Sequence, residues 1–166
     1  MDLHDFELEP QDVGVDSGQI VFIPDSPKFK HFSYPPAQLA VERGVKFDVF
    51  VKRIENERIG WFIATTESER FSDCEYVGPF ICYSDTLLVI DPCYINFTED
   101  NNYTEPMFRE FYNKVCNITL ERDFGLVEHD DFVCAASNTA WGDGSYNCYV
   151  QKKEDNKVTT VIIKMF

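Results

Sequence analysis

Positive charge is scarce in this sequence. Its 166 residues include 15 Lys and Arg against 29 Asp and Glu, which gives a formal net charge of −14. A surface this acidic repels the phosphates of nucleic acids and the headgroups of anionic lipids. The basic island formed by Lys28, Lys30 and His31 is small and could steer one phosphate group at most. We therefore expect no direct contact with nucleic acid or with a membrane.

Long hydrophobic runs are also missing. No apolar run approaches the ~20 residues that a membrane-spanning helix needs. The first sixteen residues carry six acidic side chains and neither Lys nor Arg. They therefore lack both the basic and the apolar region of a secretory signal. We interpret residues 1–16 as a solvated acidic lead-in and predict a cytoplasmic protein.

Recognisable cofactor and metal motifs are absent as well. None of the six cysteines forms a CxxC pair, and their spacing matches no zinc pattern. Without a secretory signal they are interpreted as reduced thiols. The chain has neither a GxGxxG sequence nor a phosphate-binding P-loop. We predict no cofactor and no catalytic residues.

Apolar and aromatic residues are plentiful, at 44% and 15% of the chain, which is enough for the core of one domain over residues 1–166. Apolar runs bounded by turn residues predict strands, and two amphipathic hairpins are expected at Lys46–Ile54 with Arg58–Thr65 and at Ser145–Phe166. Helical patterns cover Tyr34–Gly44 and about 104–116. The predicted fold is mainly β (α+β), an antiparallel β-sandwich or partly open barrel with one or two short helices.

The two hairpins correspond to each other without a gap at a separation of 99 residues. The run Ser84–Pro92 likewise resembles Ser17–Asp25, 67 residues earlier. One interpretation is two repeated halves, 17–83 and 84–166, with a helix inserted into the second at about 104–116. The other is that amphipathic hairpins with acidic turns resemble one another by chance.

The end of the run Ser84–Pro92 is the first candidate site. Asp91, Cys93 and Tyr94 follow a buried strand, where functional groups often emerge from a rigid scaffold. A carboxylate there can act as a base or bind a metal, and a cysteine can act as a nucleophile. The alternative is an Asp-Pro turn in which the Asp91 side chain bonds its own backbone.

The second candidate is the turn before the last hairpin, which comprises Trp141, Gly142, Asp143, Gly144 and Tyr146. Glycines that flank an acid let a ligand approach the backbone closely and can form an anion nest. A turn that begins a hairpin requires the same residues. Exposure of Trp141 would favour a binding site.

A third cluster, Val127–Asp131, contains His129 and three acids. With Asp91 and Asp143 it could bind a divalent cation. Adjacent loop residues rarely face one point, and the alternative is a solvated acidic turn.

Two of these motifs resemble an uncharacterised family of small bacterial and phage proteins. The matching residues are Asp91, Pro92, Cys93 and Tyr94, followed by Gly142, Asp143, Gly144 and Tyr146. In that family a Gly-Asp-Gly-x-Tyr turn opens a hairpin that ends in an apolar strand. The position that is often Pro-Val after the tyrosine is Asn147-Cys148 here. The resemblance implies a bacterial or phage source and no mechanism.

Three functions follow as hypotheses. The first is a non-enzymatic acidic binding protein, such as a phage-encoded inhibitor or decoy that recruits a basic surface of a host protein. The second is a small-ligand site, suited to a nucleotide, between the two halves. It would be lined by Asp91, Cys93, Tyr94, Trp141, Asp143 and Tyr146. The third is a metal-dependent hydrolase that uses Asp91, His129 and Asp143.

Overall fold

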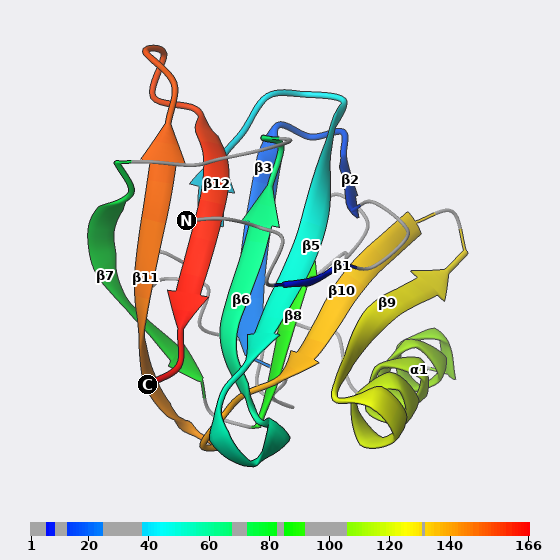
Figure 1. The fold of residues 1–166 in the computed structure, drawn as a ribbon. Coiled ribbons are helices and arrows are strands. Elements are labelled where there is room, and N and C mark those ends of the chain that lie inside the picture. Colours follow the sequence, from blue (N-terminus) through cyan, green and yellow to red (C-terminus); the bar gives the residue numbers. More distant parts are fainter. Residues whose placement is uncertain are drawn as a thin grey trace.

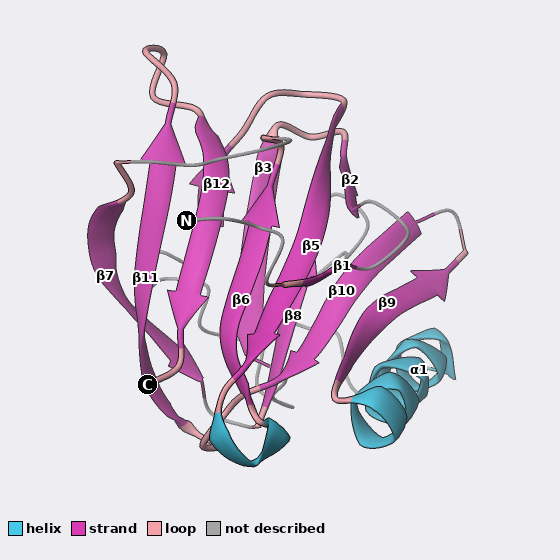
Figure 2. Cartoon of the chain, in the orientation of Figure 1, coloured by secondary structure: helices cyan, strands magenta, loops and turns pink. Residues whose placement is uncertain are grey.

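The protein is a sandwich of two antiparallel sheets with one long helix (Figures 1 and 2). The computed structural model describes residues 6–8, 13–24, 38–67, 73–82, 85–91, 106–130 and 132–166. The larger sheet has the order β1-β5-β6-β12-β11-β7, with β2 also paired to β5, and the smaller sheet has the order β4-β3-β8-β10-β9. The predicted fold class, mainly antiparallel β with a helix, is confirmed.

The strands of the larger sheet are β1 (Glu7–Leu8), β2 (Val13–Val15), β5 (Val45–Arg53), β6 (Ile59–Thr65), β7 (Glu75–Cys82), β11 (Gly144–Lys152) and β12 (Val158–Lys164). Those of the smaller sheet are β3 (Gln19–Pro24), β4 (Gln38–Ala40), β8 (Thr86–Ile90), β9 (Phe124–His129) and β10 (Phe132–Asn138). The α-helix α1 spans Pro106–Arg122, and a 3-10 turn, η2, spans Glu55–Glu57.

The core lies between the sheets, and a second apolar layer lies under α1. Phe47, Phe62 and Val161 of the larger sheet meet Leu87 and Val89 of β8 in the central core. The alternate β8 residues, Leu88 and Ile90, join a cluster with Phe111 and Val115 of α1. Because β8 is buried on both faces, its residues Leu87–Ile90 are all apolar.

The two predicted hairpins have the same register. Phe50 lies opposite Ile63 in the β5–β6 hairpin, and Tyr149 lies opposite Ile162 in the β11–β12 hairpin. Both ladders also shift register at corresponding points, between Lys52 and Arg53 and between Gln151 and Lys152. Each position in one hairpin therefore has a structural counterpart 99 residues away in the other.

A local pseudo-twofold axis passes between the hairpins. Ile63 of β6 pairs with its own counterpart, Ile162 of β12. On either side of this pair, the Thr66 amide donates to the Thr159 carbonyl at 2.9 Å and the Met165 amide donates to the Gly60 carbonyl at 2.8 Å. These two bonds are related by the same separation of 99 residues.

The smaller sheet follows the same symmetry. Phe22 of β3 lies opposite Val89 of β8, 67 residues later, as the likeness between Ser17–Asp25 and Ser84–Pro92 requires. The bond from the Val41 amide to the Gly18 carbonyl, 2.9 Å, has its counterpart in the bond from the Thr139 amide to the Asp85 carbonyl, 2.7 Å.

The outer strands extend the correspondence. Val13 of β2 pairs with Phe47, and Phe80 of β7 pairs with Tyr146. Strands β1 and β2 together thus correspond to β7, β3 corresponds to β8, β4 to β10, β5 to β11 and β6 to β12. Helix α1 and strand β9 are additional elements of the second half. The correspondence begins at β1 and β7, whereas the sequence had suggested residues 17 and 84. That it arose by duplication stays a prediction.

Three local expectations from the sequence are wrong. Residues Gln38–Ala40 form β4 rather than part of a helix, because their backbone pairs with β3; residues 34–37 lie outside the described part. Val13 and Val15 of the supposed solvated lead-in are fully buried against Phe47 and the core. The helix continues to Arg122, well beyond residue 116.

No helix in the described part of the chain is long and apolar enough to cross a membrane.

Candidate functional site

A cleft of about 700 Å³ is lined by residues of η2 and of the connection between β10 and β11. These two segments lie at the same end of the sandwich (Figure 1). The cleft lies between elements of the two corresponding halves. The first half contributes Asn56–Ile59, and the second half contributes Asp85, Asp123 and Asn138–Gly142. Two of the predicted site residues, Trp141 and Gly142, line this cleft.

The Trp141–Gly144 turn is fixed by two hydrogen bonds to one carbonyl. The Thr139 hydroxyl and the buried Tyr146 hydroxyl each donate to the Gly142 carbonyl oxygen at 2.7 Å. Gly142 has φ 83°, a left-handed conformation that favours glycine. Tyr146 therefore holds the turn, while exposed Asp143 and Gly144 lie beyond the cleft lining.

Trp141 is presented to solvent by this turn. Its side chain is 60% exposed, although tryptophan is usually well buried. The guanidinium carbon of Arg58 lies 4.5 Å from the centroid of the Trp141 ring, which is a cation–π distance. The exposure that we expected of a binding site is therefore present at Trp141.

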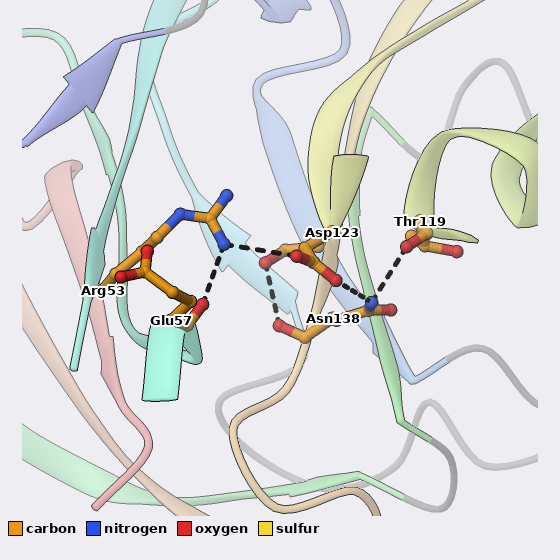
Figure 3. Close-up of polar contacts among 6 residues, drawn as sticks. Arg53, Glu57, Thr119, Asp123 and Asn138 are labelled. Carbon is orange, nitrogen blue, oxygen red and sulfur yellow. Dashed lines mark hydrogen bonds and ion pairs between the residues drawn. The ribbon is translucent and has the colours of Figure 1, made fainter. Parts of the chain in front are cut away.

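Asp123 and Asn138, which also line the cleft, belong to a polar network at the junction of α1 with β9 (Figure 3). The Asn138 amide donates to Asp123 Oδ1 at 3.0 Å and to the Thr119 carbonyl at 2.9 Å. Arg53 donates to Asp123 Oδ2 at 3.2 Å and to the Glu57 carbonyl at 2.8 Å. This network ties the inserted helix to the η2 turn.

Three charged side chains that line the cleft are not part of this network. Glu57, Arg58 and Asp85 are exposed, and within the described residues their charged groups form no ion pair or hydrogen bond. With the paired Asp123, the lining carries three carboxylates and one guanidinium. The cleft is therefore negative overall and contains charges that a ligand can engage.

The pseudo-twofold axis relates this cleft to a second position, which is closed. The closed position is lined by residues that include Glu42, Lys153, Lys157 and Val158, and its volume is about 10 Å³, which is at most enough for a single water molecule. Lys157 and Val158 are the counterparts of Arg58 and Ile59. There, Lys153 Nζ lies 3.3 Å from Glu42 Oε2 and Lys157 Nζ lies 3.4 Å from Asp155 Oδ2.

Smaller side chains open the cleft beside Trp141. The counterpart of Lys153 is Ile54, and the counterpart of Thr159 is Gly60. A Cβ atom at residue 60 would lie 2.2 Å from Ile54 Cγ2, so Ile54 lies directly over the glycine. Between β4 and β10 the separation is 98 residues, because Val41 and Thr139 make the corresponding bonds, and Glu42 therefore corresponds to Ala140. At the open cleft, therefore, the counterparts of Lys153 and Glu42 are both uncharged and shorter.

Asp91 lies at the other end of β8 from the cleft. Its carboxylate is buried and accepts hydrogen bonds from the amides of Asp16 and Ser17, at 2.6 and 3.0 Å, and from the Ser17 hydroxyl at 2.6 Å. These bonds fix the turn between β2 and β3. The chain thus folds back to bring Ser17 beside Asp91, a contact that the sequence did not predict. The interpretation that Asp91 also bonds its own Asp-Pro turn stays a prediction, because residues 92–105 lie outside the described part. Cys93 and Tyr94 lie outside the described residues.

His129 is not in a solvated turn, as had been expected, but is buried at the end of β9. Its ring packs against Phe111 and Phe132, with centroid distances of 5.4 and 5.7 Å. Its Nε2 lies 3.5 Å from the carboxylate of Asp130. Asp91 follows β8, His129 is the last residue of β9 and Asp143 precedes β11. No group of three or more potential metal ligands occurs among the described residues.

Two cysteines are buried and poorly suited to act as nucleophiles. Burial raises the pKa of Cys148 to about 12 and the pKa of Cys134 still further above its ordinary value. At neutral pH both remain thiols, which are far less nucleophilic than thiolates.

The sequence did not identify Arg58, Asp85, Asp123 or Asn138 as site residues. Each is a common surface residue type outside any motif, and the cleft that joins them arises from contacts between distant segments. Of the four, only Arg58 has a sequence signal: the register of the two hairpins makes it the counterpart of Lys157.

Comparisons with known proteins support an uncharacterised family for part of the chain. A family model described as "Protein of unknown function (DUF4241)" matches residues 93–163. This range contains the Trp141 turn, the inserted helix and most of the last hairpin. No match was found among curated proteins or among solved structures.

Proposed function

We propose that this protein is a non-enzymatic binding protein that recruits a basic surface of a partner protein through the cleft beside Trp141. The observation that carries the proposal is an exposed tryptophan in the same cleft as the carboxylates of Glu57 and Asp85, which form no ion pair with any other described residue. Aromatic rings anchor many protein interfaces, and complementary charge accelerates association and selects the partner.

The charge of the whole chain supports the same proposal. A net charge of −14 creates a long-range field that attracts basic surfaces and repels acidic ones. The resemblance of the Asp-Pro-Cys-Tyr and Gly-Asp-Gly-x-Tyr motifs to small bacterial and phage proteins gives this proposal its finer form. In that form the protein is a phage-encoded inhibitor or decoy that acts on a host component in the bacterial cytoplasm.

Fluorescence anisotropy with two labelled peptides tests the proposal. An Arg-Gly repeat peptide is expected to bind, with an affinity that falls as salt rises, whereas a Glu-Gly peptide of equal length is not. Asp85→Asn and Glu57→Gln should each weaken binding about two- to fivefold. Glu154→Gln, in the turn of the opposite hairpin, removes the same charge away from the cleft and serves as the matched control. Equal binding of both peptides, or binding that ignores salt, would contradict the proposal.

A small ligand such as a nucleotide is a second candidate, and the size of the cleft favours it. About 700 Å³ is within the range of small-molecule sites. The Trp141 ring could stack on a base, and Arg58 could pair with a phosphate. A nucleotide panel in a thermal-shift assay should then raise Tm for the wild type and not for Arg58→Gln. No shift with any nucleotide would exclude this candidate.

A further inference from the structure

We infer that Trp141 is the receptor for a single guanidinium or ammonium group of the partner, and that Arg58 of the chain itself occupies this receptor until the partner displaces it. The inference rests on the proposed function and names the chemical group recognised and the residue that competes for it. The group belongs to an arginine or lysine side chain.

The contact between Arg58 and Trp141 shows that the ring accepts a cation. The guanidinium carbon lies 4.5 Å from the ring centroid, within the ~6 Å over which the quadrupole of an aromatic face attracts a cation. Tryptophan is the strongest of the aromatic side chains in this interaction. A partner cation of the same chemistry would find the same attraction.

Arg58 is weakly held in this position. It is exposed, and within the described residues its guanidinium forms no ion pair. By contrast, the neighbouring Arg53 is fixed by Asp123 and the Glu57 carbonyl. An exposed cation–π contact contributes only about 0.5–1 kcal/mol, so a partner cation that also engages carboxylates can replace Arg58.

The carboxylates needed for that replacement line the same cleft. Glu57 and Asp85 have no charged partner within the described residues. A partner cation on Trp141 would gain attraction from these two groups, whereas the backbone of Arg58 is tied to the start of β6 and limits its reach. Displacement of Arg58 therefore exchanges one cation for another that is better surrounded by negative charge.

The closed counterpart of the cleft supports a cationic occupant. At that position the ammonium of Lys153 pairs with Glu42, and Lys157, the counterpart of Arg58, pairs with Asp155. Of the two positions related by the pseudo-twofold axis, the closed one is thus occupied by lysine–carboxylate pairs of the protein itself. At the open cleft the counterparts of Lys153 and Glu42 are Ile54 and Ala140. This leaves space for a cation from outside, beside two carboxylates that have no charged partner in the described part of the chain.

The test follows the indole N–H signals of the two tryptophans by NMR, assigned with Trp61→Phe and Trp141→Phe. N-acetyl-L-arginine amide is titrated into the full chain, with N-acetyl-L-citrulline amide as its neutral isostere. We expect the arginine compound alone to move the Trp141 signal. Trp61, which has Lys164 5.3 Å from its ring centroid, is an internal control and should not move.

Arg58→Gln tests the competition. Removing the resident cation should lower the concentration of N-acetyl-L-arginine amide needed for half-saturation about two- to fivefold. Lys157→Gln removes the same charge at the counterpart position and should leave half-saturation unchanged. A general effect of net charge would instead change both variants equally.

Three outcomes would overturn the inference: a silent Trp141 signal, an equal response to the citrulline compound, or an Arg58→Gln variant with unchanged or weaker binding. If the Arg-Gly peptide still bound in a salt-dependent way, the proposed function would stand and only the role of Trp141 would fall. If that peptide failed to bind while the arginine compound moved Trp141, the proposed protein partner would fall instead.

Discussion

Ile54 lies directly over Gly60, and a Cβ atom at residue 60 would come within 2.2 Å of Ile54 Cγ2. Their counterparts, Lys153 and Thr159, line the closed position on the other side of the pseudo-twofold axis. Because Gly60 has no side chain, Ile54 can pack over it and stay out of the cleft beside Trp141. The open volume of the cleft therefore depends on Gly60, although Gly60 is not one of the lining residues.

Gly60→Ala should destabilise the protein by about 1–3 kcal/mol, because the added methyl group forces Ile54 to move. Urea denaturation measures the free energy of unfolding. The control is Gly14→Ala, since a Cβ at residue 14 meets no atom within 4 Å. Ile54→Ala in the Gly60→Ala background should recover part of the loss. Additive losses in the double variant would show that the two side chains do not compete for this space.

Asn138→Ala should cost about 1–2 kcal/mol of unfolding free energy. The amide group donates to the Thr119 carbonyl at the end of α1 and to the Asp123 carboxylate, and the truncation removes both bonds. Chemical denaturation provides the measurement. Asn113→Ala, at an exposed position of α1, is the control and should change stability by less than ~0.5 kcal/mol. Equal effects of the two substitutions would argue against a structural role for the Asn138 bonds.

Asp91→Ala should be the most destabilising of the substitutions considered, at about 3 kcal/mol or more. It leaves the amides of Asp16 and Ser17 and the Ser17 hydroxyl without their acceptor. Asp85→Ala, at the other end of β8, removes a carboxylate with no hydrogen bond among the described residues and should be nearly neutral. Thermal unfolding of the two variants gives the comparison. A similar Tm for both would refute the anchoring role of Asp91.

Cys134 and Cys148 should resist iodoacetamide in the folded protein at pH 8. Burial raises the pKa of Cys148 to about 12 and that of Cys134 further, so the reactive thiolate is scarce at this pH and becomes more abundant only as the pH rises toward the pKa. Mass spectrometry of digested protein identifies the alkylated residues. After unfolding in urea, both should be alkylated readily. Rapid alkylation in the native state would mean that these strands open on the timescale of labelling.

Local sequence patterns were sufficient to predict most strands. The strand β3 follows from the short apolar run within Ser17–Asp25, which turn residues bound on both sides. The two hairpins follow from amphipathic strands on either side of a polar turn. The helix at Tyr34–Gly44 was wrong because pairing of Gln38–Ala40 with β3 determines the local structure. Strand β9 was missed because Val127–His129 was interpreted as part of an acidic turn.

The site was predicted only in part, because the sequence alone does not show which strands pair or in which direction each strand runs. Trp141 and Gly142, two of the predicted ligand-binding residues, line the cleft. Asp91 does not, because β8 runs antiparallel to β10, so that Asp85 at its start, rather than Asp91 at its end, meets the Thr139 backbone. Arg58 and Asp123 reach the cleft through contacts that no local pattern reveals.

The position of β12 between β6 and β11 has a consequence for biosynthesis. The larger sheet cannot assemble completely until residue 164 has left the ribosome, because the pairing of β6 with β12 joins its two parts. Until then, the β5–β6 hairpin has an unpaired edge with Phe62, Ile63 and Ala64 on it. Such edges promote aggregation of nascent chains. Rapid translation of the intervening hundred or so residues, or a chaperone on this edge, would therefore increase the yield of folded protein.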